Sequence, residues 1–166
     1  DYDSLSKQLF EMMKTESFAM GKDKINITTL HLFPAGEKLG IEMGFAGTKK
    51  GVFFLLGSPK FDNAKNVLAL KNVEYDLSTK NVLIKAAKWM LDETIRKKLE
   101  SQMVFDMSDL VNLTKKSINE SLNQTMGNGI KTQGRLKSLE LVDWSLQKDA
   151  IWVRAKTLGD IGVIVE

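Results

Sequence analysis

Residues 75–93 read YDLSTKNVLIKAAKWMLDE, and the sequence pattern changes halfway through them. Up to Leu77 the residues are typical of the end of a β-strand. From Lys80 onward the apolar residues recur at the three- and four-residue spacing of one helix face. That face carries a wide apolar stripe, made of Leu83, Ala86, Ala87, Met90, Leu91 and Ile95. The stripe either packs against a core or lines a site for an apolar ligand, and the small alanines leave both interpretations open.

The residues before this helix predict a second helix and a run of strands. Residues 1–21 have apolar residues at helical spacing, and Gly21 is the expected C-terminal cap. Four strand-like segments follow in close succession, which predicts an antiparallel meander because hairpin connections are short. These segments are DKINITTLHLF (23–33), LGIEMGF (39–45), GVFFLLGSP (51–59) and VLALKNVEYDL (67–77).

The residues after it predict one more helix and then more strand. The helix begins with Asp106 or Ser108 as its cap and ends at GNG, residues 127–129. Strands follow over 130–142 and 144–166, with breaks at the turn QKDA and at the pair Gly159–Asp160. The order helix, strands, two helices, strands indicates the α+β class, because parallel α/β folds alternate strands and helices. We expect one domain over residues 1–166, with a twisted antiparallel sheet wrapped around the amphipathic helices.

The composition argues against several classes of function. The chain of 166 residues has no cysteine, a single histidine and a net charge of +3. Thiolate metal sites and disulfides are therefore excluded, and we expect no metal and no cofactor. The basic residues are interspersed with acidic ones, so no nucleic-acid partner is expected. No apolar run approaches the roughly 20 residues of a transmembrane helix.

The sequence also lacks the motifs of common enzymes, and we expect no enzymatic activity. His31 lies between Leu30 and Leu32 in a predicted strand, and no GxSxG motif accompanies it. A structural position is therefore the better interpretation of this histidine. The segment GFAGTKKG lacks the GK[ST] ending of a phosphate-binding loop and is interpreted as a hairpin turn. The Asn-x-Ser/Thr matches at Asn112, Asn119 and Asn123 fall on one predicted helix and are interpreted as polar helix surface.

Three segments carry a resemblance to a family. The stretches GVFFLLGSPKFD, LALKNVEYDLSTKNVLIKAAKWML and VFDMSDL resemble the C-terminal part of a family of uncharacterised bacterial envelope proteins, over residues 51–110. Glu74 and Met90 depart mildly from the family pattern. The resemblance implies the C-terminal portion of a longer exported chain, in the periplasm or elsewhere in the bacterial envelope. The arrangement is also loosely similar to the tubular lipid-binding superfamily typified by bactericidal permeability-increasing protein, which implies an apolar tunnel and no catalytic residue.

Two functions follow from these observations. The first is a non-catalytic envelope module that holds a lipid or another apolar molecule in a groove between sheet and helices, since such sites are concave and mainly apolar. The alternative is a structural or protein-interaction domain, with an envelope protein as partner and no small-molecule ligand. For the first function, the candidate lining residues are Leu83, Ala86, Ala87, Met90, Ile95, Leu110, Ile118 and Leu122.

Overall fold

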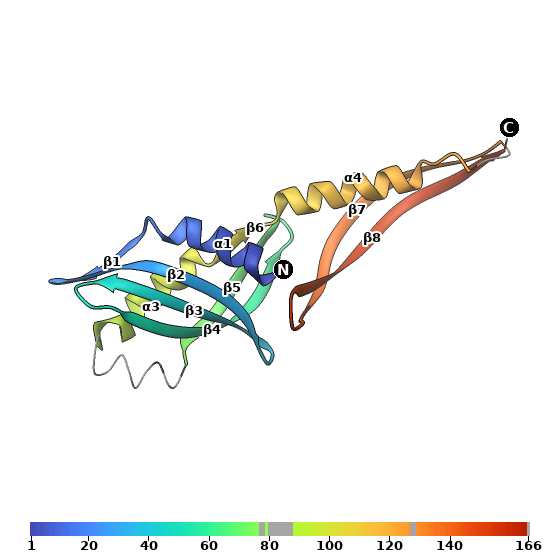
Figure 1. The fold of residues 1–166 in the computed structure, drawn as a ribbon. Coiled ribbons are helices and arrows are strands. Elements are labelled where there is room, and N and C mark those ends of the chain that lie inside the picture. Colours follow the sequence, from blue (N-terminus) through green and yellow to red (C-terminus); the bar gives the residue numbers. More distant parts are fainter. Residues whose placement is uncertain (77–78, 80–87, 127–128, 166) are drawn as a thin grey trace. The chain divides into compact units, whose positions relative to one another are not determined.

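A computed structural model describes residues 1–76, 79, 88–126 and 129–165 of the chain. Its contacts divide the chain into two compact units (Figure 1). The first unit comprises Asp1–Lys60, Leu68–Phe105 and Ser145–Trp152, and the second comprises Phe61–Val67, Asp106–Trp144 and Val153–Glu166. The sequence predicts that residues 1–166 form one domain. Whether the two units belong to one domain depends on how they are joined, so this stays a prediction.

The first unit is built on a six-stranded sheet whose strands follow one another in chain order, β1 to β6. The first three pairings, β1 with β2, β2 with β3 and β3 with β4, are antiparallel. With the helices packed on this sheet, the α+β class is confirmed. The strands are β1 (Ser17–Met20), β2 (Asp23–Ala35), β3 (Lys38–Gly47), β4 (Gly51–Asp62), β5 (Val67–Tyr75) and β6 (Val104–Asp106). The helical elements are α1 (Tyr2–Met13), the 3₁₀-helix η1 (Lys88–Leu91) and α3 (Glu93–Gln102).

The core of this unit follows from the two-residue period of its strands. In β3 the predicted inward set is buried: Leu39, Ile41, Met43 and Phe45. The opposite face of β3 is covered too, because Phe33 of β2 pairs with Gly40. A Cβ atom on Gly40 would lie 2.4 Å from the Phe33 ring, so the ring packs directly over this glycine and would have to move for any larger residue.

Helix α3 closes the outer edge of β5 with side chains instead of a strand. The backbone N–H of Val73 donates to the Glu100 carboxylate, and the guanidinium of Arg96 donates to the Val73 carbonyl at 3.0 Å. Nearby, β6 extends the sheet for three residues, and the N–H of Leu70 donates to the Met103 carbonyl. These backbone groups on the edge of β5 are therefore satisfied within the unit.

The second unit contains α4 (Ser108–Leu122) and most of the two long strands β7 (Ile130–Leu146) and β8 (Ile151–Val165), which form a two-stranded sheet. The N-cap of α4 is Met107, so the predicted caps Asp106 and Ser108 are wrong. The Asp106 carboxylate lies one residue before the cap and accepts the N–H of Ser108, the first residue of the helix, at 2.8 Å. Hydrogen bonds from Ser108 lower the pKa of this carboxyl group below its ordinary value.

Several predicted boundaries are wrong for identifiable reasons. Helix α1 ends at Met13, and residues 17–20 form β1 instead of a last helical turn, because they pair with β2. Gly21, with φ +62°, lies in the turn between β1 and β2, where only a residue tolerant of positive φ is unstrained. The predicted break at Gly159–Asp160 does not occur, since β8 continues through both residues.

The predicted helices of the later region also differ from the structure. The helix expected from Lys80 to Ile95 is interrupted, because Asp92 is extended and caps a new helix by accepting the Thr94 N–H at 2.8 Å. Met90 in η1 and Ile95 in α3 therefore lie on different elements. Helix α4 ends at Leu122, before GNG, and β6 separates it from α3 along the chain.

Candidate functional site

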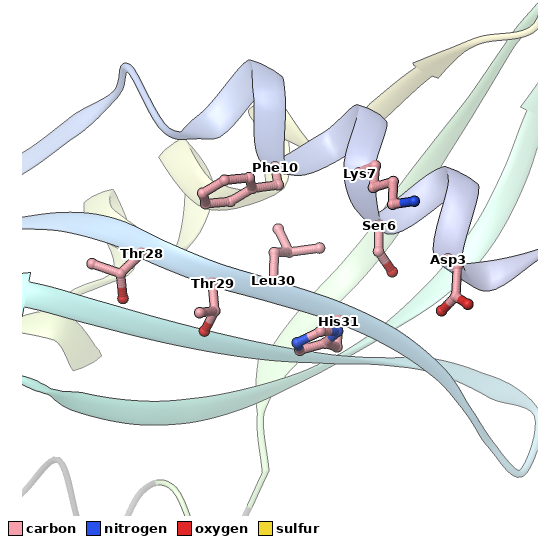
Figure 2. Close-up of a pocket in the computed structure, with 8 residues that line it drawn as sticks. All are labelled: Asp3, Ser6, Lys7, Phe10, Thr28, Thr29, Leu30 and His31. Atoms are coloured by element: carbon pink, nitrogen blue, oxygen red, sulfur yellow. The ribbon is translucent and has the colours of Figure 1, made fainter.

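The first unit has a cavity of about 300 Å³ between α1 and β2 (Figure 2). The helix contributes four residues and the strand four consecutive ones. These lining residues are Asp3, Ser6, Lys7, Phe10, Thr28, Thr29, Leu30 and His31. In Figure 2, Leu30 points toward α1 while His31 lies on the other side of the strand ribbon, as the alternation of a strand requires.

The cavity exists because β1 is much shorter than β2. Strand β1 pairs only with residues 23–26 of β2, so the rest of that edge has no strand beside it. Helix α1 lies there, and Ser6 connects the two elements. Its hydroxyl donates to the Tyr2 carbonyl at 2.7 Å and accepts the Leu32 N–H at 2.9 Å.

A serine, a histidine and an aspartate all line the cavity, but they do not form a catalytic triad. A triad requires hydrogen bonds of about 2.6–3.2 Å from nucleophile to base and from base to carboxylate. Among the described residues, His31 makes no hydrogen bond to Ser6 or to Asp3, and the Ser6 proton is engaged by the Tyr2 carbonyl. The cavity is lined by both polar and apolar residues, and the charges of Asp3 and Lys7 form no ion pair with any described residue.

The described residues lack two features that would indicate a function. In that part of the chain, no group of three or more histidines and acidic residues is placed to hold a metal ion. None of its helices is long and apolar enough to cross a membrane.

The second unit exposes many large apolar side chains. On α4, Val111, Ile118 and Leu122 follow helical spacing; Val111 is buried and the other two are half-buried. Leu110 and Leu113 are exposed by 54% and 63%, so the helix carries apolar residues outside its packed face. The exposed apolar residues of this unit are Leu110, Leu113, Met126, Val142, Val153, Leu158, Ile161, Val163, Ile164 and Val165.

Comparison with models of known protein families identifies the family of this chain. Residues 1–165 match the model of a domain of unknown function, DUF4403. The chain belongs to the DUF4403 family. No curated protein and no solved structure matches the chain. Membership of an uncharacterised family agrees with the resemblance seen in the sequence, while the similarity to tubular lipid-binding proteins stays a prediction.

The predicted lining residues of this DUF4403 domain are distributed over both units. Leu83, Ala86 and Ala87 lie outside the described residues. Met90 and Ile95 are buried in the first unit. In the second unit, Leu110 is exposed and Ile118 and Leu122 are half-buried on α4.

Sequence reasoning missed two features of the DUF4403 domain. It did not connect residues 3–10 with residues 28–31, because no spacing rule relates a helix to a strand edge. It also interpreted Asn119 and Asn123 as polar helix surface, whereas their amides bond to the backbone of β7. Their four-residue spacing, which puts both on one helix face, was the available signal.

Proposed function

We propose that this chain is a non-catalytic binding module that holds a lipid or another apolar molecule against α4, β7 and β8. The supporting observation is the set of exposed aliphatic side chains in the second unit. Large exposed apolar patches are uncommon on soluble monomers and mark sites that bind ligands, proteins or membranes, and the proposal is that these side chains supply such a patch. The proposal keeps the predicted residues Leu110, Ile118 and Leu122 as part of the binding surface.

The difference between the two units supports this proposal. The first unit buries a full set of core side chains, including Phe53, Phe105 and Leu70 at 0% exposure. In α4, by contrast, Val111 is the one buried residue. Full burial of one leucine or isoleucine side chain stabilises by about 1.5–3 kcal/mol. An apolar ligand that covered several residues of the second unit would therefore gain a substantial free energy without specific polar contacts.

The resemblance found in the sequence extends the proposal to location and architecture. We place the module in the bacterial envelope as part of a longer exported chain, with the apolar ligand between a curved sheet and a helix. The support is the similarity of residues 51–110 to an envelope family and the looser similarity to tubular lipid-binding proteins. The alternative, a structural or protein-interaction domain, needs no ligand and is decided by the same experiment.

The experiment is mass spectrometry of the natively purified chain, followed by solvent extraction and identification of any lipid. The test variant is Leu110→Gln with Leu113→Gln, which removes apolar surface from α4 and keeps helix propensity. The matched control is Met12→Gln, an exposed apolar residue (43%) on helix α1 of the first unit.

A stoichiometric adduct in the natural chain, weakened in the double variant and kept in Met12→Gln, is the expected result. An apo mass that stays unchanged after incubation with phospholipid or fatty acid would overturn the proposal. In that case the apolar surface of the second unit belongs to a protein interface.

A further inference from the structure

The outer edge of β7 is closed by side-chain amides. The Asn123 amide makes two hydrogen bonds with the backbone of Gly134, at 2.9 and 3.1 Å, and the Asn119 carbonyl accepts the Leu136 N–H at 3.0 Å. Farther along, Asn63 makes the same paired contact with Leu141, with both distances 2.9 Å. These amides occupy the positions that a neighbouring strand would take, so β7 has little capacity to accept another strand.

The outer edge of β8 is different. Strand β8 has β7 as its neighbour in a two-stranded sheet, and residues 152–165 are all exposed. Within the described part of the chain, no backbone or side-chain hydrogen bond reaches this edge from outside the sheet. A two-stranded ribbon is marginally stable in water, and a long unpaired apolar edge is a template for a further strand.

We infer that this edge pairs with β8 of a second copy of the chain. Two identical strands pair antiparallel around a twofold axis, so one residue must lie opposite itself. The midpoint of β8, which runs from Ile151 to Val165, is Leu158. An axis at Leu158 uses the whole strand and merges the two ribbons into one four-stranded sheet.

Charge and apolar patterns favour this register. With Leu158 on the axis, Val153 lies opposite Val163 of the second copy, and Lys156 lies opposite its Asp160. Lys156 has no ion pair with any described residue, whereas Asp160 is already 2.6 Å from the Lys137 ammonium. Each dimer would thus gain two Lys156–Asp160 pairs. Centring the axis on Lys156 would instead place two like charges opposite each other, which is unfavourable.

The test uses the absence of cysteine from the chain. In Leu158→Cys the two thiols would face each other across the axis, at the 4.5–5.5 Å Cα separation of antiparallel pairs, which a disulfide spans. In the matched variant Thr157→Cys, each thiol would lie opposite Gly159 of the second copy and on the other face from Leu158. Leu158 is 60% exposed, so its replacement leaves the folded chain intact.

Two measurements decide the proposal. Sedimentation of the unaltered chain should give twice the monomer mass of 18.6 kDa, and mild oxidation should link Leu158→Cys and leave Thr157→Cys as free thiol. A monomer in sedimentation would overturn the dimer. A dimer in which Thr157→Cys is linked, or neither variant is, would overturn this pairing of β8. None of these outcomes depends on whether the chain binds a lipid.

Discussion

Tyr75, the last residue of β5, connects this strand to the 3₁₀-helix η1. Its ring is 4% exposed and meets the Phe53 ring edge-on, with centroids 5.9 Å apart. Its hydroxyl donates a hydrogen bond to the Met90 carbonyl. Burial raises the pKa of this phenol, and the nearby Arg96 guanidinium opposes that shift only in part. A single side chain thus joins the end of β5 to η1.

Tyr75→Phe should destabilise the first unit by about 1–3 kcal/mol, because the buried Met90 carbonyl loses its donor while the ring stays in place. Denaturant unfolding of the two proteins at neutral pH measures this difference. The pH dependence gives a second readout. Folding raises the pKa of the Tyr75 phenol, so the unfolded chain ionises first as the pH rises above about 10. The stability that the protonated phenol contributes is complete below about pH 10 and is lost as the pH rises toward the folded-state pKa.

The variant should therefore lose less stability than the natural chain between neutral pH and about pH 10.5. Part of the alkaline loss should remain, since burial and the nearby Asp149 also raise the pKa of Tyr2. Equal losses in the two proteins would show that Tyr75 does not remain protonated in the fold.

At the scale of elements, asparagine amides join α4 to β7. Asn123 donates to the carbonyls of Asn119 and Gly134 and accepts the Gly134 N–H. Asn123 therefore both ends helix α4, as its C-cap, and occupies the outer edge of β7 at Gly134. The helix and the strand are therefore expected to lose order together when the amide is removed.

Asn123→Ala should lower the stability of the second unit by about 0.5–1.5 kcal/mol and speed hydrogen exchange at the Gly134 amide. Exchange followed by NMR measures both effects. The matched control is Asn112→Ala, an exposed asparagine on the same helix with no side-chain hydrogen bond to a described residue. Comparable effects of the two substitutions would indicate that the Asn123 amide does not close the strand edge.

The elements differ in how far the sequence predicts them. The four predicted strands are found because strand residues point alternately to the two faces of a sheet, so burial of one face imposes a period of two, as in Leu39, Ile41 and Met43 of β3. Strand β1 is missed because residues 17–20 are too few to show that period, and their pairing with β2 determines their conformation. The break at Asp92 is missed because the apolar spacing continues across it, while a capping contact with Thr94 interrupts the helix.

At the scale of the molecule, the candidate sites depend on contacts that a linear pattern does not contain. The cavity of the first unit needs residues 3–10 beside residues 28–31, and that placement follows from the shortness of β1. The apolar residues of β8 were recognised as strand residues, but their exposure could not be read from the sequence, because alternating apolar residues predict burial. Ile118 and Leu122 lie half-buried on α4, as their helical spacing predicts, and their part in a binding site stays a prediction.

The difference in burial between the units predicts a difference in local stability. In native-state hydrogen exchange, the amides of Ile41 and Leu55 should exchange slowest, because their strands lie inside the six-stranded sheet and their side chains are fully buried. Amides of β8 from Val153 to Val165 should exchange much faster in dilute solution, since a two-stranded ribbon with exposed side chains opens at little cost. If copies of the chain pair through β8, protection there should rise with protein concentration while that of Ile41 stays constant. Protection of β8 equal to that of β3 at every concentration would contradict this view, because the second unit would then need no partner to hold its strands.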